Sequence, residues 1–440
     1  MKKLLLCSLF LAAATTQAQF WTAKPTGFTT ASRGINGISI VDANVVWAKA
    51  YDGSGGGAHI REYTRSTNGG ETWVPGSVNV AGIQAGTDIS SITAVSSTNA
   101  WVSTNPSAQG GTNGIYVTTN GTSWSKQTTA AFTSASFANF VHFWNANNGV
   151  CMGDPVGGYF EIYTTSNGGT TWTRVAQANI PDPAGGEEYG YTNNFAFAGN
   201  SIWFGTSSGR LYRSTDFGAT WSAFQAPLSD FGSATLSGAY SFSDNNKGLL
   251  SLSDGTLFST TDGGETWNLV SYNGTLFVGD IAYVPGTSMA VATSVSAAAI
   301  NGTGSAYTLN DGETWVTTDT GVQYNTVRFF NNTTGFSGGF NSSATVGGIY
   351  KYTGNALATA QFGASKLTVS PNPSSGIYEL AGAPVQSVLV TDMLGKQVFK
   401  ADFGMAERNT VDLTSANNGV YLMTITGEDG AQKTVKLIKQ

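Results

Sequence analysis

Short runs of β-branched and aromatic residues, separated by clusters of Gly, Asn and Ser, make up most of the chain between residues 20 and 355. Examples are Ile89–Val95, Ala138–Trp144 and Tyr159–Thr165. Runs of this length that are bounded by turn residues are typical of β-strands. No window in this region has a long apolar pattern with the helical period. The pattern therefore predicts an all-β fold built from many short antiparallel strands.

A turn motif recurs six times along this region. In each copy a Ser or Thr is followed two positions later by Asn or Asp, then by Gly and finally by Trp. The copies span residues 66–73, 118–124, 165–172, 214–221, 260–267 and 308–315, and the second copy is one residue shorter. The tryptophans are 51, 48, 49, 46 and 48 residues apart. Four short strands in a repeat of this length predict one blade of a β-propeller.

This recurring turn has a structural explanation. The Asn or Asp side chain accepts hydrogen bonds from nearby backbone amides, Gly supplies a positive φ, and Trp anchors the returning strand. Because chemical sites are usually single on a fold, six similar copies favour a folding element over a ligand site. The residues with this structural role are Asn68, Trp73, Asn120, Trp124, Asn167, Trp172, Asp216, Trp221, Asp262, Trp267, Asn310 and Trp315.

The two ends of the repeat region predict how the ring closes. After the last complete repeat there are three strand-like runs without a fourth, at Thr326–Phe330, Gly335–Phe340 and Gly348–Tyr352. At the other end, Phe20–Thr22 is an isolated strand whose tryptophan lies one repeat length before Trp73. The simplest closure pairs this N-terminal strand with the last three. We therefore expect seven blades and no long exposed edge.

The pattern Ser-x-Asp-x-Gly-x-Thr-Trp resembles the Asp-box, or BNR, repeat of sialidase-type propellers. Similar repeats occur in sortilin ectodomains, xyloglucanases and photosystem assembly-factor propellers. The resemblance covers roughly residues 20–355, and the second copy, Asn120–Trp124, departs from it by one deletion. It implies a propeller at residues 19–355 but does not specify a function.

Residues 1–18 have the features of a secretory signal peptide. Lys2 and Lys3 precede an apolar run over Leu4–Ala14, and small residues occupy the cleavage positions. We expect cleavage before Gln19. Removal of the two lysines leaves 19 basic against 27 acidic residues, so the net charge changes from −6 to −8. A nucleic-acid partner is therefore not expected, and no apolar stretch after residue 19 is long enough to span a bilayer.

The composition changes after Gly354, where tryptophan ends and lysine becomes frequent. Residues 356–365 are interpreted as a linker, and alternating apolar positions in residues 366–440 predict a small β-sandwich. This segment resembles the type A, immunoglobulin-like C-terminal sorting domain of the type IX secretion system. The matching features are Pro371-Asn372-Pro373, the turn Asp392–Lys396, the strand Asn418–Tyr421 and the tail lysines Lys433, Lys436 and Lys439.

The sorting-domain resemblance implies a location and a partner. The signal peptide would direct the chain across the inner membrane, and residues 366–440 would engage the type IX machinery for passage across the outer membrane. The family also implies removal of this domain and attachment to surface lipopolysaccharide. We therefore expect a secreted or outer-membrane-surface protein of a Gram-negative bacterium.

Propeller topology indicates which face carries function. Turns one to two and three to four of each blade share one face, here called the motif face because the recurring turns lie on it. Turns two to three and the connections between blades share the opposite, connection face. The long insertions fall on the connection face, at Tyr51–His59, Asn105–Asn113, Asp154–Gly158 and Ala176–Thr192. Long loops on a rigid scaffold are frequent carriers of binding sites.

The last insertion combines carboxylates with aromatic residues, as glycan and peptide sites do. The ligand-binding candidates are Asp154, Asp182, Glu187, Glu188, Tyr189 and Tyr191. One hypothesis is a binding cleft, and another is a solvated acidic loop. A third is a glycoside hydrolase in which Asp154 acts with Glu187 or Glu188 as the paired carboxylates.

The enzyme hypotheses meet specific obstacles. A sialidase would need three clustered arginines, but Arg65 and Arg213 immediately precede recurring turns and thus belong to the other face. A xyloglucanase-like enzyme usually has two tandem propellers. His59 and His142 belong to different repeats, and Cys151 is interpreted as a buried structural residue, so no metal site or cofactor is predicted. The sequence therefore favours a binding module for a glycan or a protein, with glycoside hydrolysis as the alternative.

Overall fold

The computed structural model describes residues 19–106, 111–133, 136–354, 367–426 and 432–440. The expected signal peptide and linker, and part of the insertion Asn105–Asn113, lie outside these ranges. The described chain consists of β-strands joined by turns, with two 3-10 turns, η1 (Gln177–Asn179) and η2 (Ala184–Gly186). None of its helical segments has the length and apolarity needed to cross a membrane.

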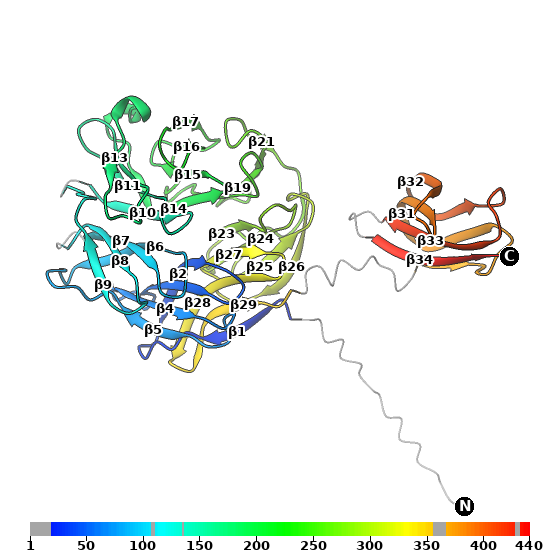
Figure 1. Ribbon diagram of the computed structural model, residues 1–440, viewed down its shortest axis with the longest axis horizontal. Coiled ribbons are helices and arrows are strands. Elements are labelled where there is room, and N and C mark those ends of the chain that lie inside the picture. Colours follow the sequence, from blue (N-terminus) through cyan, green and yellow to red (C-terminus); the bar gives the residue numbers. More distant parts are fainter. Residues whose placement is uncertain (1–18, 107–110, 134–135, 355–366, 427–431) are drawn as a thin grey trace, which may run out of the picture.

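Residues 19–354 form antiparallel sheets arranged around a common centre (Figure 1). The first sheet contains β2 (Arg33–Ile40), β3 (Val46–Asp52), β4 (Glu62–Ser66) and β5 (Val74–Ser77). The second contains β6 (Thr87–Ala94), β7 (Ala100–Pro106), β8 (Gly114–Thr118) and β9 (Trp124–Gln127). The third contains β10 (Ala138–Phe143), β11 (Gly149–Pro155), β12 (Phe160–Thr165) and β13 (Thr173–Arg174). Within each of these three groups the strands pair in sequence order, and the first group belongs to a larger sheet that also contains strands from both ends of the region.

The same order continues along the chain. The fourth sheet contains β14 (Gly190–Ala198), β15 (Ser201–Thr206), β16 (Arg210–Ser214) and β17 (Ser222–Gln225). The fifth contains β18 (Gly238–Phe242), β19 (Gly248–Leu252), β20 (Leu257–Thr260) and β21 (Asn268–Leu269). The sixth contains β23 (Asp280–Tyr283), β24 (Ala290–Ser294), β25 (Gly304–Thr308) and β26 (Thr314–Thr320), with β22 (Asn273–Gly274) added parallel to β26.

The two ends of this region meet in one sheet. β27 (Thr326–Asn331), β28 (Thr334–Ser343) and β29 (Val346–Tyr352) are followed spatially by β1 (Trp21–Pro25). β1 pairs antiparallel with β29 from Trp21↔Tyr352 to Pro25↔Gly348, and Figure 1 places these strands side by side. The Trp21 indole is buried and donates a hydrogen bond to Ser305 Oγ at 2.9 Å. The N-terminal strand thus contacts both the last strand and the sixth sheet.

The recurring turns join the third and fourth strands of their sheets. In the first copy, Ser66 Oγ accepts a hydrogen bond from the Gly70 amide at 2.8 Å, and Asn68 Oδ1 accepts one from the Thr72 amide at 2.9 Å. The fourth copy repeats this geometry, with Ser214 accepting from Gly218 at 2.9 Å. The side-chain hydrogen bonds therefore close each turn on itself, as the sequence pattern suggests.

Aromatic rings fill the spaces between neighbouring sheets. Trp101 of β7 stacks on Phe143 of β10 at a centroid distance of 3.6 Å, and Trp203 of β15 stacks on Phe242 of β18 at 3.9 Å. Both tryptophans are almost completely buried. Because such contacts join successive sheets, the core of this region is a series of inter-sheet layers that hold the connecting loops in place.

Residues 367–426 and 432–440 form a hydrogen-bonded set of five strands. They are β30 (Thr368–Ser370), β31 (Ile377–Asp392), β32 (Gln397–Asp412), β33 (Gly419–Thr426) and β34 (Gln432–Lys439). The long β31 pairs with both β32 and β33, so all five strands belong to one continuous sheet network around a core that includes Tyr378, Val390 and Met423. The expected immunoglobulin-like sandwich remains a prediction for this network.

The Pro-Asn-Pro motif has a defined place in this network. Asn372 Nδ2 donates to the Lys436 carbonyl at 2.7 Å, and Asn372 Oδ1 accepts from the Ile438 amide at 2.9 Å. One side chain therefore joins the beginning of the C-terminal segment to its last strand. This contact explains why an asparagine is suited to the position between the two prolines.

Candidate functional site

The connection between the third and fourth sheets contains most of the residues that the sequence suggests for ligand binding. It includes η1 and η2 and leads into β14 at Gly190. Because β14 is the first strand of its sheet, this connection lies on the connection face. The structure brings Asp154, Glu188, Tyr189 and Tyr191 to the entry of β14, whereas Asp182 and Glu187 lie on exposed parts of the loop.

Glu188 is the internal anchor of this loop. Its side chain is inaccessible to solvent and forms an ion pair with Arg210, with Arg210 Nε 3.1 Å from Glu188 Oε1. Thr206 Oγ1 and the Ala184 amide also donate to this carboxylate. Burial acts to raise the pKa of Glu188, but hydrogen bonds from Arg210, Thr206 and Ala184 lower it below its usual value. Glu188 is therefore an ionised structural group and is poorly suited to donate a proton.

Asp154 joins the third sheet to the start of the fourth. Its Oδ1 accepts hydrogen bonds from Asn139 Nδ2 at 2.8 Å and from the Gly190 amide at 3.0 Å. Burial raises the pKa of Asp154 to about 6, although both hydrogen bonds oppose this shift. A carboxyl group with this pKa exchanges its proton close to neutral pH and has the acidity expected of a general acid.

Tyr189 and Tyr191 form the aromatic part of the loop. Tyr189 is 46% exposed, and its ring lies edge-on to Tyr191 with centroids 5.4 Å apart. The Tyr191 hydroxyl donates to Asp230 Oδ1 at 2.5 Å, and the Tyr189 amide donates to Ser207 Oγ at 3.0 Å. Burial and the hydrogen bond to Asp230 raise the pKa of Tyr191. The Tyr191 ring is thus fixed through its hydroxyl, and the solvent-exposed Tyr189 ring packs against its edge.

Asp182 and Glu187 contribute less to the internal geometry. Asp182 Oδ1 accepts from Gln177 Nε2 at 3.2 Å, and the Asp182 carbonyl accepts from Arg210 Nη2 at 2.7 Å. Glu187 is exposed next to the buried Glu188. Sequence reasoning did not identify Arg210 or Asp230, because both come from other segments and neither has a local motif that marks its role.

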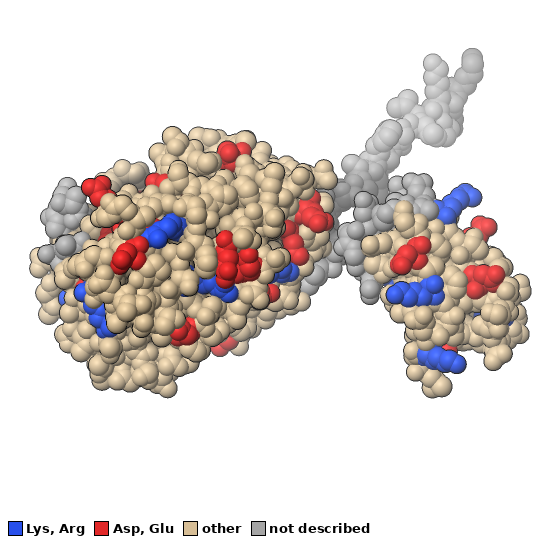
Figure 2. All heavy atoms as spheres, turned by 90° about the horizontal axis from the view of Figure 1, so that it is seen from above, with Lys and Arg blue, Asp and Glu red and all other residues tan. Residues whose placement is uncertain are grey.

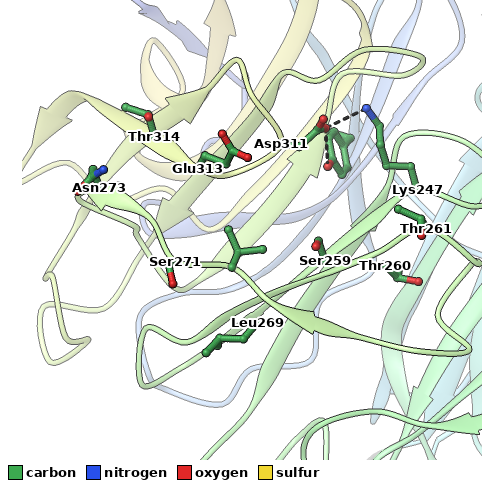
Figure 3. A pocket seen from close by; sticks show the side chains of 12 residues that line it. Lys247, Ser259, Thr260, Thr261, Leu269, Ser271, Asn273, Asp311, Glu313 and Thr314 are labelled. Atoms are coloured by element: carbon green, nitrogen blue, oxygen red, sulfur yellow. Dashed lines mark hydrogen bonds and ion pairs between the residues drawn. The ribbon is translucent and has the colours of Figure 1, made fainter. Parts of the chain in front are cut away.

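A second concave site lies on the motif face, between the fifth and sixth sheets (Figure 3). It is a pocket of about 500 Å³ whose wall includes Lys247, Thr260, Leu269, Tyr283 and Asp311. Asp311 Oδ1 lies 2.9 Å from Lys247 Nζ and accepts a hydrogen bond from the Tyr283 hydroxyl at 2.9 Å. Hydroxyl groups of serine and threonine cover much of the remaining wall. The pocket therefore offers a polar surface with one internal ion pair.

The sequence contained one signal for this second site. The fourth position of the recurring turn is Gly69, Gly168 and Gly263 in three full-length copies, but Phe217 and Asp311 in the other two. Asp311 adopts a φ of 56°, in the left-handed region that favours glycine. A non-glycine residue at this position is a departure from the repeat that places a side chain on the motif face.

The histidines and the cysteine have separate environments. His59 Nδ1 lies 2.7 Å from Asp88 Oδ2, whereas His142 is buried among aromatic rings and burial lowers its pKa to about 3. Cys151 is buried, which raises the pKa of its thiol. Within the described ranges, no group of three or more His, Cys, Asp or Glu side chains is arranged to hold a metal ion.

Comparison with known proteins identifies the C-terminal segment. Residues 368–440 match the family described as "Secretion system C-terminal sorting domain". This match confirms the expected type IX sorting domain and indicates a secreted or cell-surface protein that engages the secretion machinery. No curated protein matches the chain by sequence.

The repeat region resembles solved propeller structures. "YCF48 bound to D1 peptide" is 16% identical with a TM-score of 0.52, and the match covers 76% of this chain and 97% of that one. "YCF48 from Cyanidioschyzon merolae" is 15% identical with a TM-score of 0.51, and the match covers 76% of this chain and 98% of that one. At this level of identity the likeness shows the fold alone, an all-β propeller.

Proposed function

We propose that this protein is an exported binding module whose ligand, an extracellular glycan or a protein surface, contacts the connection face. The observation that carries the proposal is the aromatic pair Tyr189 and Tyr191 on a loop anchored by the buried Glu188–Arg210 ion pair. A fixed, partly exposed aromatic pair binds with little loss of conformational entropy. Asp182 and Glu187 would add polar contacts at its rim. The likeness to a propeller solved with a bound peptide adds support to the binding role.

We propose further that the repeat region is a seven-bladed propeller closed by its N-terminal strand. The pairing of β1 with β29 and the burial of Trp21 support this arrangement, since both join the first residues of the mature chain to the last repeat. The recurring turns support membership of the Asp-box type. On this proposal residues 19–355 form the propeller, and the ring has no unpaired long edge.

The alternative function is glycoside hydrolysis on the same face. Asp154 favours it, because burial raises the pKa of this carboxyl to about 6. A hydrolase also needs a second carboxylate across the scissile bond. The charge of Glu188 is balanced by Arg210 in an internal ion pair. Glu187 is therefore the remaining candidate for the second carboxylate. The binding proposal therefore has the stronger structural support.

We propose that export follows the route implied by the two ends of the chain. Residues 1–18 would act as a cleaved signal peptide, residues 356–365 as a linker and residues 366–440 as the sorting domain. The match of residues 368–440 to the sorting family supports this order. The host would be a Gram-negative bacterium, and the sorting domain would be removed when the propeller is attached to or released from the surface.

The test uses the chain from residue 19 to residue 440 against arrays of glycans and extracellular proteins, together with a broad glycosidase screen. Replacing Tyr189 or Tyr191 by Ala should weaken binding by about 1–3 kcal/mol, as expected for an aromatic anchor. Phe330→Ala is a control because Phe330 is also exposed, at 41%, but belongs to another sheet. Turnover that is lost in Asp154→Asn would replace the binding proposal by the hydrolase alternative. Unchanged affinity in both tyrosine variants would contradict the proposed face.

A further inference from the structure

The fourth residue of the recurring turn adopts a left-handed backbone in every full-length copy. The φ values are 69° at Gly69, 71° at Gly168, 61° at Phe217, 79° at Gly263 and 56° at Asp311. Glycine adopts this conformation without a steric penalty, and Asp tolerates it better than most residues. A phenylalanine is the least suited of the five. Because strained residues cluster at functional sites, the left-handed Phe217 is a reason to expect a function at this position.

Phe217 belongs to a cluster of rings, here called the aromatic patch and defined as His142, Trp144, Phe197 and Phe217, in which His142 is buried and Trp144 is half-buried. The Phe217 and Trp144 rings meet edge to face with centroids 5.0 Å apart. The ring centroids of Trp144 and His142 are 4.7 Å apart, and those of His142 and Phe197 are 4.1 Å apart. Phe197 is 52% exposed and Phe217 is 41% exposed. Two neighbouring sheets therefore contribute to the patch on the motif face, where the exposed rings of Phe197 and Phe217 pack against the less exposed His142 and Trp144.

The interior of the patch contains unsatisfied polar groups. His142 Nε2 and Trp144 Nε1 are buried and have no hydrogen-bond partner among the described atoms. The indole nitrogens of Trp124, Trp267 and Trp315 are also buried without a partner. An unpaired indole is thus a common feature of the repeats, whereas the unpaired nitrogen of His142 is specific to the patch. A buried polar group without a partner is destabilising, because its lost hydrogen bonds to water are not replaced. Backbone strain, exposed apolar area and an unpaired nitrogen thus coincide in one place.

The surroundings of the patch restrict the chemistry of an occupant. His142 is held neutral by burial, so none of the four side chains carries a charge. The adjoining turn between β10 and β11 contains Asn145, Asn147 and Asn148, of which Asn145 Oδ1 already accepts hydrogen bonds from the Asn147 and Asn148 amides. Charged residues make up only 11% of the whole chain, and in the view of Figure 2 they are scattered over a mostly uncharged surface. A partner with a strongly charged surface would find few complementary groups here.

We propose that the aromatic patch is a second binding site, for a neutral saccharide. The C–H face of a pyranose ring is weakly positive and packs on the negative face of an aromatic ring, while asparagine amides pair with its hydroxyl groups. The exposed rings of Phe217 and Phe197 would carry the stacking contacts, and Trp144 would support Phe217. This site lies on the motif face, and its occupation does not depend on ligand binding at Tyr189 and Tyr191.

The test measures binding of a panel of neutral glucose, xylose, mannose and galactose oligosaccharides to residues 19–440 by calorimetry. An acidic oligogalacturonate and an array of aromatic-rich peptides serve as comparison probes. Phe217→Gly should lower saccharide affinity at least tenfold and should also raise the melting temperature, because glycine relieves the left-handed strain. Phe197→Ser should lower affinity without this stabilisation. A purely structural role for Phe217 predicts a lower melting temperature instead.

Ser32→Gly is the matched control, since Ser32 also has a left-handed φ of 62° and belongs to neither candidate site nor the aromatic patch. We expect it to leave saccharide affinity unchanged. Failure of the whole panel to bind, or full affinity in Phe217→Gly, would overturn the proposal. Capture of peptides but not saccharides, abolished by Phe217→Gly, would overturn the saccharide assignment. Loss of saccharide binding in Tyr189→Ala but not in Phe217→Gly would refute this site while supporting the connection-face proposal.

Discussion

Removal of the N-terminal strand should destabilise the propeller by several kcal/mol. The Trp21 side chain is 2% exposed and Phe20 is 7% exposed. Replacing a buried Trp by Ala typically costs about 3–5 kcal/mol. Trp21→Ala also removes the hydrogen bond to Ser305, but Ser305 retains contacts to Thr318, so no buried hydroxyl is left without a partner. We therefore expect Trp21→Ala to lower the free energy of unfolding by about 3–5 kcal/mol, and deletion of residues 19–25 to lower it further.

Guanidinium denaturation followed by circular dichroism measures this effect without relying on tryptophan fluorescence. Val74→Ala is the control, because Val74 is 61% exposed on an outer strand and its loss should change stability by less than about 0.5 kcal/mol. A peptide of residues 19–27 added to the deletion variant should restore stability, by about 2.7 kcal/mol at 100 times its Kd. If Trp21→Ala is no more destabilising than Val74→Ala, or if the peptide has no effect, closure by this strand is refuted.

Three further predictions concern the sorting domain, Asp154 and Glu188. Deletion of residues 366–440 should leave a folded propeller in the periplasm, and equal amounts of intact and truncated protein at the cell surface, measured by protease accessibility, would contradict this. The pKa of Asp154 is raised from 3.8 to about 6 in the folded state, so its contribution to stability is complete below pH 4 and is lost as the pH rises through 6. Asp154→Asn should therefore reduce the change in the free energy of unfolding between pH 4 and pH 6. An unchanged pH dependence would show that Asp154 does not cause it. Glu188→Gln should lower stability by about 3–5 kcal/mol by leaving Arg210 without its charge partner, whereas Glu265→Gln, at a 49% exposed partner of Arg213, should have little effect.

Much of the fold was predictable because its determinants are local. The recurring turn encodes its own hydrogen bonds: in Ser66–Trp73 the hydroxyl, the amide oxygen and the glycines all act within eight positions of the chain. Strand-like runs between turns then give the sheet order, since sequential antiparallel strands pair with their neighbours. Three strands without a fourth suggested a partner for the N-terminal strand, which pairs with β29, and closure of a seven-bladed ring stays a prediction. The sorting segment was predictable from its motifs, of which Asn372 has a clear structural role.

The candidate site was less accessible to sequence reasoning because its decisive contacts are not local. Glu188 and Arg210 are 22 residues apart, and Tyr191 and Asp230 are 39 residues apart. Without these partners, Glu188 is indistinguishable in the sequence from its exposed neighbour Glu187. Tertiary contacts assign one carboxylate to an internal ion pair and leave the other in solvent. The composition of the loop thus indicated a candidate region, while the availability of each side chain depended on segments from other strands.

Departures from the repeat carry a different kind of information from long insertions. The recurring motif does not restrict the conformation of an insertion such as Ala176–Thr192. A polar side chain in such an insertion can therefore have a purely structural role, as Glu188 does. A substitution within the recurring turn keeps the backbone fixed, as the left-handed φ of both Phe217 and Asp311 shows. The side chain must then compensate for the lost glycine by its own contacts. Asp311 does so through Lys247 and Tyr283, whereas Phe217 makes an edge contact with Trp144 and remains 41% exposed. The uncompensated member of the pair is therefore the better place to look for a ligand.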